Sequence, residues 1–120
     1  MAKKENQLVE EERKRVGIVE MKTLINLLAV VVTLNASAYC HTGNPTASGV
    51  MPAVGQCAVD KINGQWVPFG TCIALPDGRV LIVTDRFGGG YDNRLDIFME
   101  TENECWEFGR RWLRCRVEMS

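Results

Sequence analysis

The sequence predicts an all-β protein, a small closed β-barrel with one short helix near its C-terminus. Short runs rich in β-branched and aromatic residues recur between clusters of glycine, proline, asparagine and aspartate, as in strands joined by turns. Only 101–109 carries clear helix signals. The 120 residues suffice for one domain. Closure into a barrel would remove the exposed edges of so many short strands.

In the first half of the chain, alternation of apolar and polar residues predicts the strands, and clusters of turn-forming residues predict the loops between them. The run VVVTLNASAYC is β-branched and partly alternating, which predicts a first strand over 30–40. A loop over 42–49, rich in Gly, Pro, Asn and Ser, follows it. A short strand is expected at 56–60, and a turn at 63–71 leads into the next pair of strands.

The second half contains a hairpin, a strand, a helix and a last strand. In the hairpin, two apolar runs over 72–83 flank Pro76-Asp77-Gly78, a strong turn signal. A strand is expected at 94–99 and another over 110–119. Between them, Thr101 and Glu104 form a capping-box pattern, and Gly109 is a natural helix stop.

The N-terminal third divides into a charged and a hydrophobic segment ahead of the barrel. Residues 1–20 hold five acids and five bases, which predicts a solvated helix or disorder. The hydrophobic segment 21–34 fits either of two interpretations, an export signal or short anchor, or a lead-in to the first strand. In the first interpretation cleavage would follow Ala38, and any membrane contact would be made through this segment alone. The barrel domain is expected over 32–120.

Charge and cysteine content exclude several classes of function. The formal net charge of −1 gives no basic excess, so a nucleic-acid partner is not expected. The chain has five cysteines, no C-x-x-C pair and one histidine, so neither a structural zinc site nor a cofactor is predicted. The acids are not spaced as in a calcium loop. The cysteines fit either disulfides or buried free thiols.

Five motifs carry a resemblance to a known family. The stretches SAYCHTGNPTASG, GQCAVD, VPFGT, TDRFGGGYDNRLDIFM and FGRRWLRCRV occur in this order between about 32 and 117. Together they resemble the 3D domain, which is named for three shared aspartates. They are also similar to the C-terminal part of the membrane-bound lytic transglycosylase A family.

The resemblance implies a six-stranded double-psi β-barrel that acts on the glycan strands of peptidoglycan. It also implies an extracytoplasmic protein, secreted or in the cell envelope, or a phage-encoded protein that acts on the host wall. The three family aspartates correspond to Asp60, Asp85 and Asp96. Asp96 then takes the catalytic acid/base role and Asp85 is its partner. The family's usual Thr-Gly-Gly is replaced here by Arg86-Phe87-Gly88, which bears on substrate fit.

Further residues are expected along the substrate groove. The candidate substrate-binding residues are Asp60, Thr46, Ser48, Tyr39 and Gly88, of which only Asp60 follows from the resemblance. For Asp60 a purely structural role is the alternative. Thr46 and Ser48 would either bind sugar or brace the carboxylates.

The chemistry expected of the aspartate pair is lytic transglycosylation. Two nearby carboxylates do not both ionise readily, so the pKa of one rises and that group holds its proton closer to neutral pH. Such a group can protonate the bond between MurNAc and GlcNAc, and then take the proton of the 6-hydroxyl as a 1,6-anhydro ring closes. Neither a second nucleophile nor an attacking water is needed, unlike in a hydrolase with two catalytic carboxylates.

Other interpretations remain open. Aspartates beside glycines are often turn residues that bond their own backbone. The barrel could be a non-catalytic, expansin-like wall-binding module or a structural phage protein. Trp66 is a candidate for stacking on sugar rings, whereas Trp106 and Trp112 are expected to fill the core.

Overall fold

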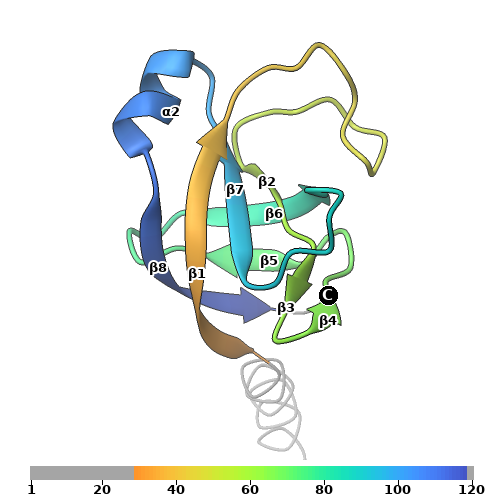
Figure 1. The fold of residues 1–120 in the computed structure, drawn as a ribbon, viewed down its shortest axis with the longest axis vertical. Coiled ribbons are helices and arrows are strands. Elements are labelled where there is room, and N and C mark those ends of the chain that lie inside the picture. The colour runs from red at the N-terminus through yellow and green to blue at the C-terminus, as the bar shows by residue number, and fades with distance from the viewer. Residues whose placement is uncertain (1–28, 119–120) are drawn as a thin grey trace, which may run out of the picture.

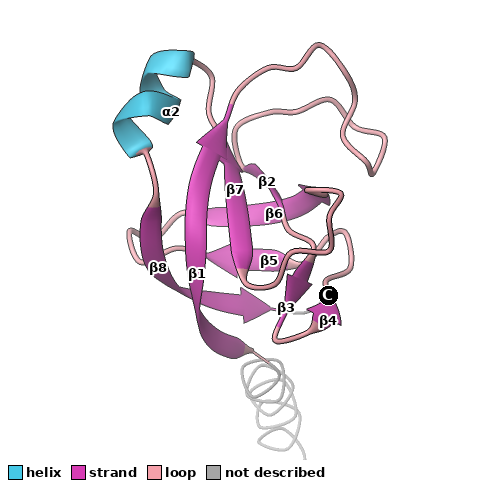
Figure 2. Cartoon of the chain, in the orientation of Figure 1, coloured by secondary structure: helices cyan, strands magenta, loops and turns pink. Residues whose placement is uncertain are grey.

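The computed structural model describes residues 29–118, so the predictions for 1–20 and for most of 21–34 fall outside the described residues. Within that range eight strands and one helix are present, coloured along the chain in Figure 1 and by type in Figure 2. In chain order they are β1 Val30–Tyr39, β2 Gln56–Ala58, β3 Lys61–Ile62, β4 Gln65–Trp66, β5 Cys72–Ala74, β6 Val80–Asp85, β7 Arg94–Phe98, α2 Glu102–Phe108 and β8 Arg111–Glu118.

Six of the strands close into a barrel in the order β1-β7-β2-β6-β5-β8. The pairs β1·β7 and β2·β6 are parallel, and the other four pairs are antiparallel. The connections interlock, because β7 lies between the consecutive strands β1 and β2, and β2 lies between the consecutive strands β6 and β7. The predicted small six-stranded barrel with one short helix near the C-terminus is therefore confirmed.

The core fills the barrel with one face of each strand. Residues spaced by two along a strand share a face, and in β1 this places Leu34 and Ala36 in the interior. Leu95 and Ile97 of β7 do the same, each with at most 1% of its surface exposed. The alternate residues Ser37 and Asp96 therefore lie on the outer face of the wall, where both are half-buried.

The cysteines are free thiols in the structure. Cys57 in β2 and Cys115 in β8 are fully buried among the apolar core residues. In that setting each behaves as a small apolar side chain, which is one of the two interpretations that the sequence left open.

Strand β1 is central to the wall and begins at Val30, two residues before the expected start of the barrel. It pairs with β8 from Val30 to Ala36 and with β7 from Asn35 to Tyr39. Cleavage after Ala38 would leave only Tyr39 of this strand, so the barrel described here depends on the residues that a cleaved signal would remove. The seven-residue helix α2 is too short to span a bilayer, and the described residues contain no other helix.

A small hairpin stands where the sequence predicted only a turn. Strands β3 and β4 pair Lys61 with Trp66 and Ile62 with Gln65. Asn63 and Gly64 join them, with φ angles of 50° and 79°. An Asn-Gly pair with both φ angles positive is the turn that matches the twist of a two-residue hairpin. Strands of two residues carry too little alternation to be recognised in the sequence.

The prediction that Trp106 and Trp112 fill the core is wrong. Trp106 is 84% exposed and Trp112 is 70% exposed. Phe108 is the buried residue of α2, and Trp106 lies on another face of that helix. In β8 the side chains of Cys115 and Val117 point inward. Trp112 is three positions before Cys115, an odd spacing along a strand, so its side chain points outward. Position within the element, not residue type, decides the burial of these side chains.

Candidate active site

Two of the predicted aspartates lie in one row across the barrel wall. Ala58 of β2 is the register partner of Asp85 on β6 and also of Asp96 on β7. Asp96 in turn is opposite Ser37 on β1. Neighbouring strands lie about 4.8 Å apart, so the Cα atoms of Asp85 and Asp96 are about 10 Å apart with one small side chain between them.

An irregularity in the strand pairing places Asp85 in this row. Cys57 is opposite Val83, but the next residue, Ala58, is opposite Asp85, so Thr84 is skipped. An extra residue of this kind re-aims the side chains that follow it. With a regular ladder Ala58 would face Thr84, and the row would contain one carboxylate.

The Asp96 carboxyl is half-buried and has one hydrogen bond from a protein group. Ser37 Oγ donates to Asp96 Oδ1 over 3.0 Å. Burial raises the pKa of Asp96 above its ordinary value, and the nearby negative charge of Asp85 adds to this. The Ser37 hydrogen bond and the charges of Arg94 and Arg110 act in the opposite direction without reversing the shift. Asp96 therefore holds its proton to a higher pH than an exposed aspartate does.

Asp85 is the more strongly hydrogen-bonded member of the pair. Its Oδ1 accepts the backbone N–H of Ala47 over 2.9 Å and that of Arg86 over 2.8 Å. The negative charge of Asp85 disfavours ionisation of Asp96 and so contributes to the raised pKa of Asp96.

The loop 46–50 fixes Asp85 in place. Thr46 is 5% exposed, and its Oγ1 donates to the carbonyl of Val50 over 2.8 Å and lies 3.0 Å from Ser48 Oγ. The Ser48 N–H bonds the carbonyl of Thr84 over 3.0 Å, which docks the loop on the end of β6. In this structure Thr46 and Ser48 brace the loop that supplies a donor to Asp85.

Tyr39 lies at the end of β1 beside the two carboxyls. Its ring packs edge-on against Phe98, with centroids 5.6 Å apart. The hydroxyl is buried and has no hydrogen-bond partner among the described residues. Burial, and then the charges of Asp85 and Asp96, raise the pKa of the phenol well above its ordinary value. Tyr39 therefore brings an O–H donor to the neighbourhood of the pair.

Asp60 has different surroundings, because it lies inside the glycine turn. It is fully buried, and its carboxylate accepts the N–H groups of Phe87 at 2.8 Å, Gly88 at 3.4 Å and Tyr91 at 3.1 Å. Burial by itself would raise its pKa, but the hydrogen bonds from Tyr91, Phe87, Gly88 and Gly90 outweigh burial and lower it. Asp60 therefore acts as an ionised clamp for the turn. Gly88 is exposed on that turn at φ 93°, a conformation that favours glycine.

Sequence reasoning missed Ser37, Ala58 and Arg94. Ser37 shares the outward phase of β1 with Tyr39, so strand periodicity alone could have placed it beside the site. Arg94 precedes Asp96 by two positions and shares its face by the same rule. Ala58 carries no local signal, because its position between the aspartates depends on pairing between strands far apart in the chain.

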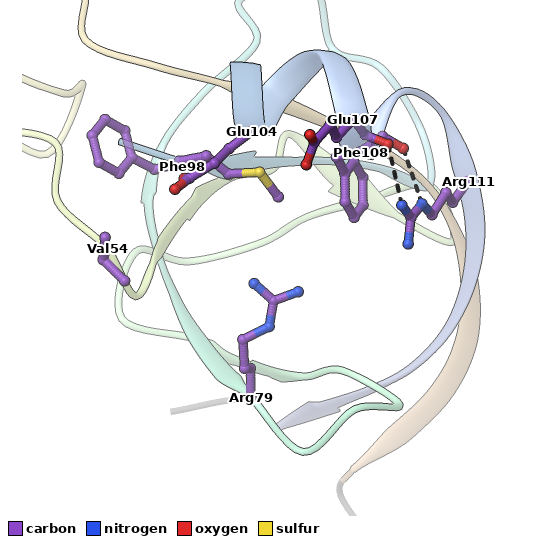
Figure 3. A pocket seen from close by; sticks show the side chains of 8 residues that line it. Val54, Arg79, Phe98, Glu104, Glu107, Phe108 and Arg111 are labelled. Atoms are coloured by element: carbon purple, nitrogen blue, oxygen red, sulfur yellow. Dashed lines mark hydrogen bonds between the residues drawn. The ribbon is translucent and has the colours of Figure 1, made fainter. Parts of the chain in front are cut away.

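A cavity of about 320 Å³ lies beneath α2 and is separate from the carboxylate row (Figure 3). It is lined mainly by Arg79, Phe98, Glu104, Glu107, Phe108 and Arg111. Arg79 Nε already pairs with Asp77 Oδ2 at 2.8 Å, and Arg111 Nε donates to the Phe108 carbonyl at 2.9 Å. Since neither Asp85 nor Asp96 lines this cavity, its size does not identify the reactive centre.

Within residues 29–118, no group of three or more His, Cys, Asp or Glu side chains is arranged to hold a metal ion. No protein-family model and no curated protein matches this chain. The features of this chain that bear on its function are therefore the geometry of the carboxylate row and the five sequence motifs.

Proposed function

We propose that this protein is a lytic transglycosylase-like enzyme that cleaves the MurNAc–GlcNAc bond of peptidoglycan with a 1,6-anhydro product. One observation carries the proposal: a half-buried Asp96 with a raised pKa, in one row with Asp85 and Ser37. An acid that keeps its proton toward neutral pH is what protonation of a glycosidic oxygen requires. The order and spacing of the five sequence motifs add support.

Asp96 carries out both proton transfers in this proposal. It first donates its proton to the oxygen of the departing GlcNAc as the bond to C1 of MurNAc breaks. The 6-hydroxyl oxygen of the same MurNAc then bonds C1, and its proton returns to Asp96. No water is consumed and the enzyme regains its starting state. Asp85 stabilises the positive charge that develops on the sugar, and Ser37 orients the acid.

A second candidate is a wall-binding barrel that does not cleave glycan. The two backbone hydrogen bonds to Asp85 favour it, because a loop-fixing role accounts for that carboxylate without any chemistry. In this case the carboxylate row would be part of a binding face.

Product analysis separates the candidates. The purified protein is incubated with purified peptidoglycan, and the muropeptides are identified by mass spectrometry. We expect anhydro-muropeptides, and Asp96→Asn should lower their formation by at least about 10²-fold. Asp92→Asn is the matched control, since Asp92 is an exposed aspartate of the same turn region. Ordinary reducing ends would contradict the proposal and indicate a hydrolase. Binding to the wall without any product would favour the second candidate.

A further inference from the structure

Aromatic and cationic side chains alternate over the glycine turn and the neighbouring hairpin. We call this set the aromatic strip. Its members are Phe69, Arg86, Trp66, Lys61, Tyr91, Phe87 and Arg94.

One half of the strip is built on the β3–β4 hairpin. The Arg86 guanidinium lies 4.1 Å from the ring centroid of Phe69 and 5.8 Å from that of Trp66. Lys61 Nζ lies 5.1 Å from the Trp66 ring centroid. Such contacts attract a cation to an aromatic face without neutralising its charge.

The other half of the strip follows the glycine turn toward β7. The Arg94 guanidinium lies 4.9 Å from the centroid of Phe87 and 5.6 Å from that of Tyr91. The two rings meet edge-on with centroids 5.8 Å apart. Arg94 is two residues before Asp96 on the same strand, so this end of the strip reaches the proposed acid.

Gly90 joins the two halves. A Cβ at this position would lie 3.8 Å from the Trp66 ring and 3.7 Å from Lys61 Nζ. The Lys61 N–H also bonds the carbonyl of Tyr91 over 3.1 Å. The turn therefore holds the hairpin side chains against those of the turn as one continuous surface.

Within the described part of the chain the cations of the strip form no ion pair with a carboxylate, although the charge of Arg94 acts on nearby Asp96 and opposes the rise in its pKa. Among residues 29–118, no Asp or Glu lies within ion-pair distance of Lys61, Arg86 or Arg94. Arg86 donates to the carbonyls of Val59 at 2.9 Å and Val67 at 2.6 Å, so its position is fixed. The Nε of Arg94 is buried and has no hydrogen-bond partner among the described residues. The strip thus presents positive charge in a chain whose formal net charge is −1.

Ring surface remains open to a ligand. Trp66 is 56% exposed, Tyr91 is 50% exposed and Phe69 is 39% exposed. Aromatic faces that are exposed and held in place by neighbouring groups are suited to stacking on the apolar face of a sugar ring. Cations at intervals between the rings are suited to carboxylates on the same ligand.

We propose that the aromatic strip is a binding subsite for an acidic, carboxylate-bearing glycan. Sugar rings stack on Trp66 and Tyr91, and carboxylates of the glycan's substituents meet Lys61 and Arg94. The choice of a glycan rests on the proposed function, and the strip would hold the chain that leads into Asp96. Single-stranded nucleic acid also stacks on aromatic side chains, but its binding is dominated by phosphate charge, and three cations in a chain without a basic excess fit it less well.

Binding is measured on the full chain carrying Asp96→Asn, so that no ligand is consumed. The probes for calorimetric titration are soluble peptidoglycan chains with peptide carboxylates, a neutral GlcNAc oligomer of equal length, and oligo-dT. We expect the acidic glycan to bind about tenfold more tightly than the neutral one, which corresponds to a difference in binding free energy of about 1.4 kcal/mol. Adding Trp66→Ala should weaken acidic-glycan binding by about tenfold. Trp66→Phe, which keeps a ring, should restore most of the affinity, and Lys61→Gln should reduce the preference for the acidic probe.

Trp106→Ala is the matched control, because Trp106 is a tryptophan on α2, outside the strip, and is more exposed than Trp66, at 84% against 56%. Unchanged acidic-glycan binding in both Trp66→Ala and Tyr91→Ala would overturn the inference, as would tighter binding of oligo-dT than of glycan. Equal affinity for the acidic and neutral probes would also overturn it. This experiment measures binding and no cleavage. A failure of the strip proposal, seen as unchanged binding in the variants, is therefore distinguishable from a failure of the proposed function, seen as the absence of anhydro product.

Discussion

Two aspartates of this barrel, Asp60 and Asp96, lie in surroundings that shift their pKa values in opposite directions. Asp60 in the glycine turn is fully buried and accepts three backbone N–H groups. Asp96 on β7 is half-buried and accepts one side-chain hydroxyl. Their pKa values move in opposite directions, down for Asp60 and up for Asp96. The supply of hydrogen-bond donors, more than the depth of burial, therefore decides in which direction the pKa of each of these carboxyls moves.

The largest effect is expected where the donors are most numerous. Asp60→Ala removes the buried acceptor of three part-buried backbone N–H groups, so it should lower the free energy of unfolding by about 3–5 kcal/mol. Urea denaturation measures this. Asp77→Ala is the control, since Asp77 accepts the Arg79 N–H in an exposed turn and its loss should cost less than about 1 kcal/mol. A cost for Asp60→Ala that matches the control would show that the turn does not depend on the clamp.

The same isosteric substitution should have opposite signs at the two sites. At pH 7, Asp60→Asn removes charge-assisted hydrogen bonds and brings an NH₂ group toward N–H donors, so stability should fall by about 2 kcal/mol. Asp96→Asn removes a poorly solvated charge, so stability should stay the same or rise by up to about 1 kcal/mol. Parallel urea titrations of the two variants measure the difference. Losses of equal size would remove the distinction drawn here.

Asp60 and Asp96 should also contribute to stability with opposite dependences on pH. Asp60 has a lowered pKa in the folded state, so its stabilisation is present above the ordinary aspartate value of 3.8 and is lost as pH falls through the folded pKa. Asp96 has a raised pKa, so its unfavourable contribution is absent below the ordinary value and develops as pH rises through the folded pKa. Stability curves of Asp60→Asn and Asp96→Asn should therefore approach the unmodified protein from opposite sides as pH falls from 7. Curves that stay parallel would contradict this.

The smallest effect is expected from the donor to Asp96. The Ser37 hydrogen bond lowers the pKa of Asp96, so Ser37→Ala should raise that pKa further. In the proposed mechanism activity falls as the acid ionises, so the alkaline limb of the pH–rate profile should move to higher pH. Ser37→Thr keeps a hydroxyl and should restore the original limb. An unchanged limb in Ser37→Ala would show that Ser37 does not act through Asp96.

The fold was largely predictable from local patterns. Alternation and turn signals located the barrel strands, and the capping pattern at Thr101 located α2, whose N-cap hydroxyl accepts the Glu104 N–H over 3.1 Å. The β3–β4 hairpin was missed because two-residue strands have almost no periodicity. Trp106 and Trp112 were wrongly expected in the core because large aromatic residues are usually buried. Their positions along the helix and the strand instead direct both side chains to the surface.

The sequence pointed to the aspartates of the candidate site, but not to the residues around them or to the distances between strands. The three aspartates came from the resemblance of their motifs, whereas the row through Ala58 depends on pairings that join β2 to two distant strands. The skipped Thr84 that brings Asp85 into the row has no local signature. The role of Asp60 as a clamp could not be predicted from residue types, because the groups that donate to it are backbone N–H groups.

The contrast between Asp60 and Asp96 is tested most directly by measuring both pKa values. Aspartate side-chain carboxyls labelled with ¹³C are followed by NMR through an acid titration of the folded protein, and Asp60→Asn and Asp96→Asn assign the two signals. We predict that Asp96 titrates above the ordinary value of 3.8 and Asp60 below it. Titration of Asp96 at or below the ordinary value would contradict the proposed role of Asp96 as the acid.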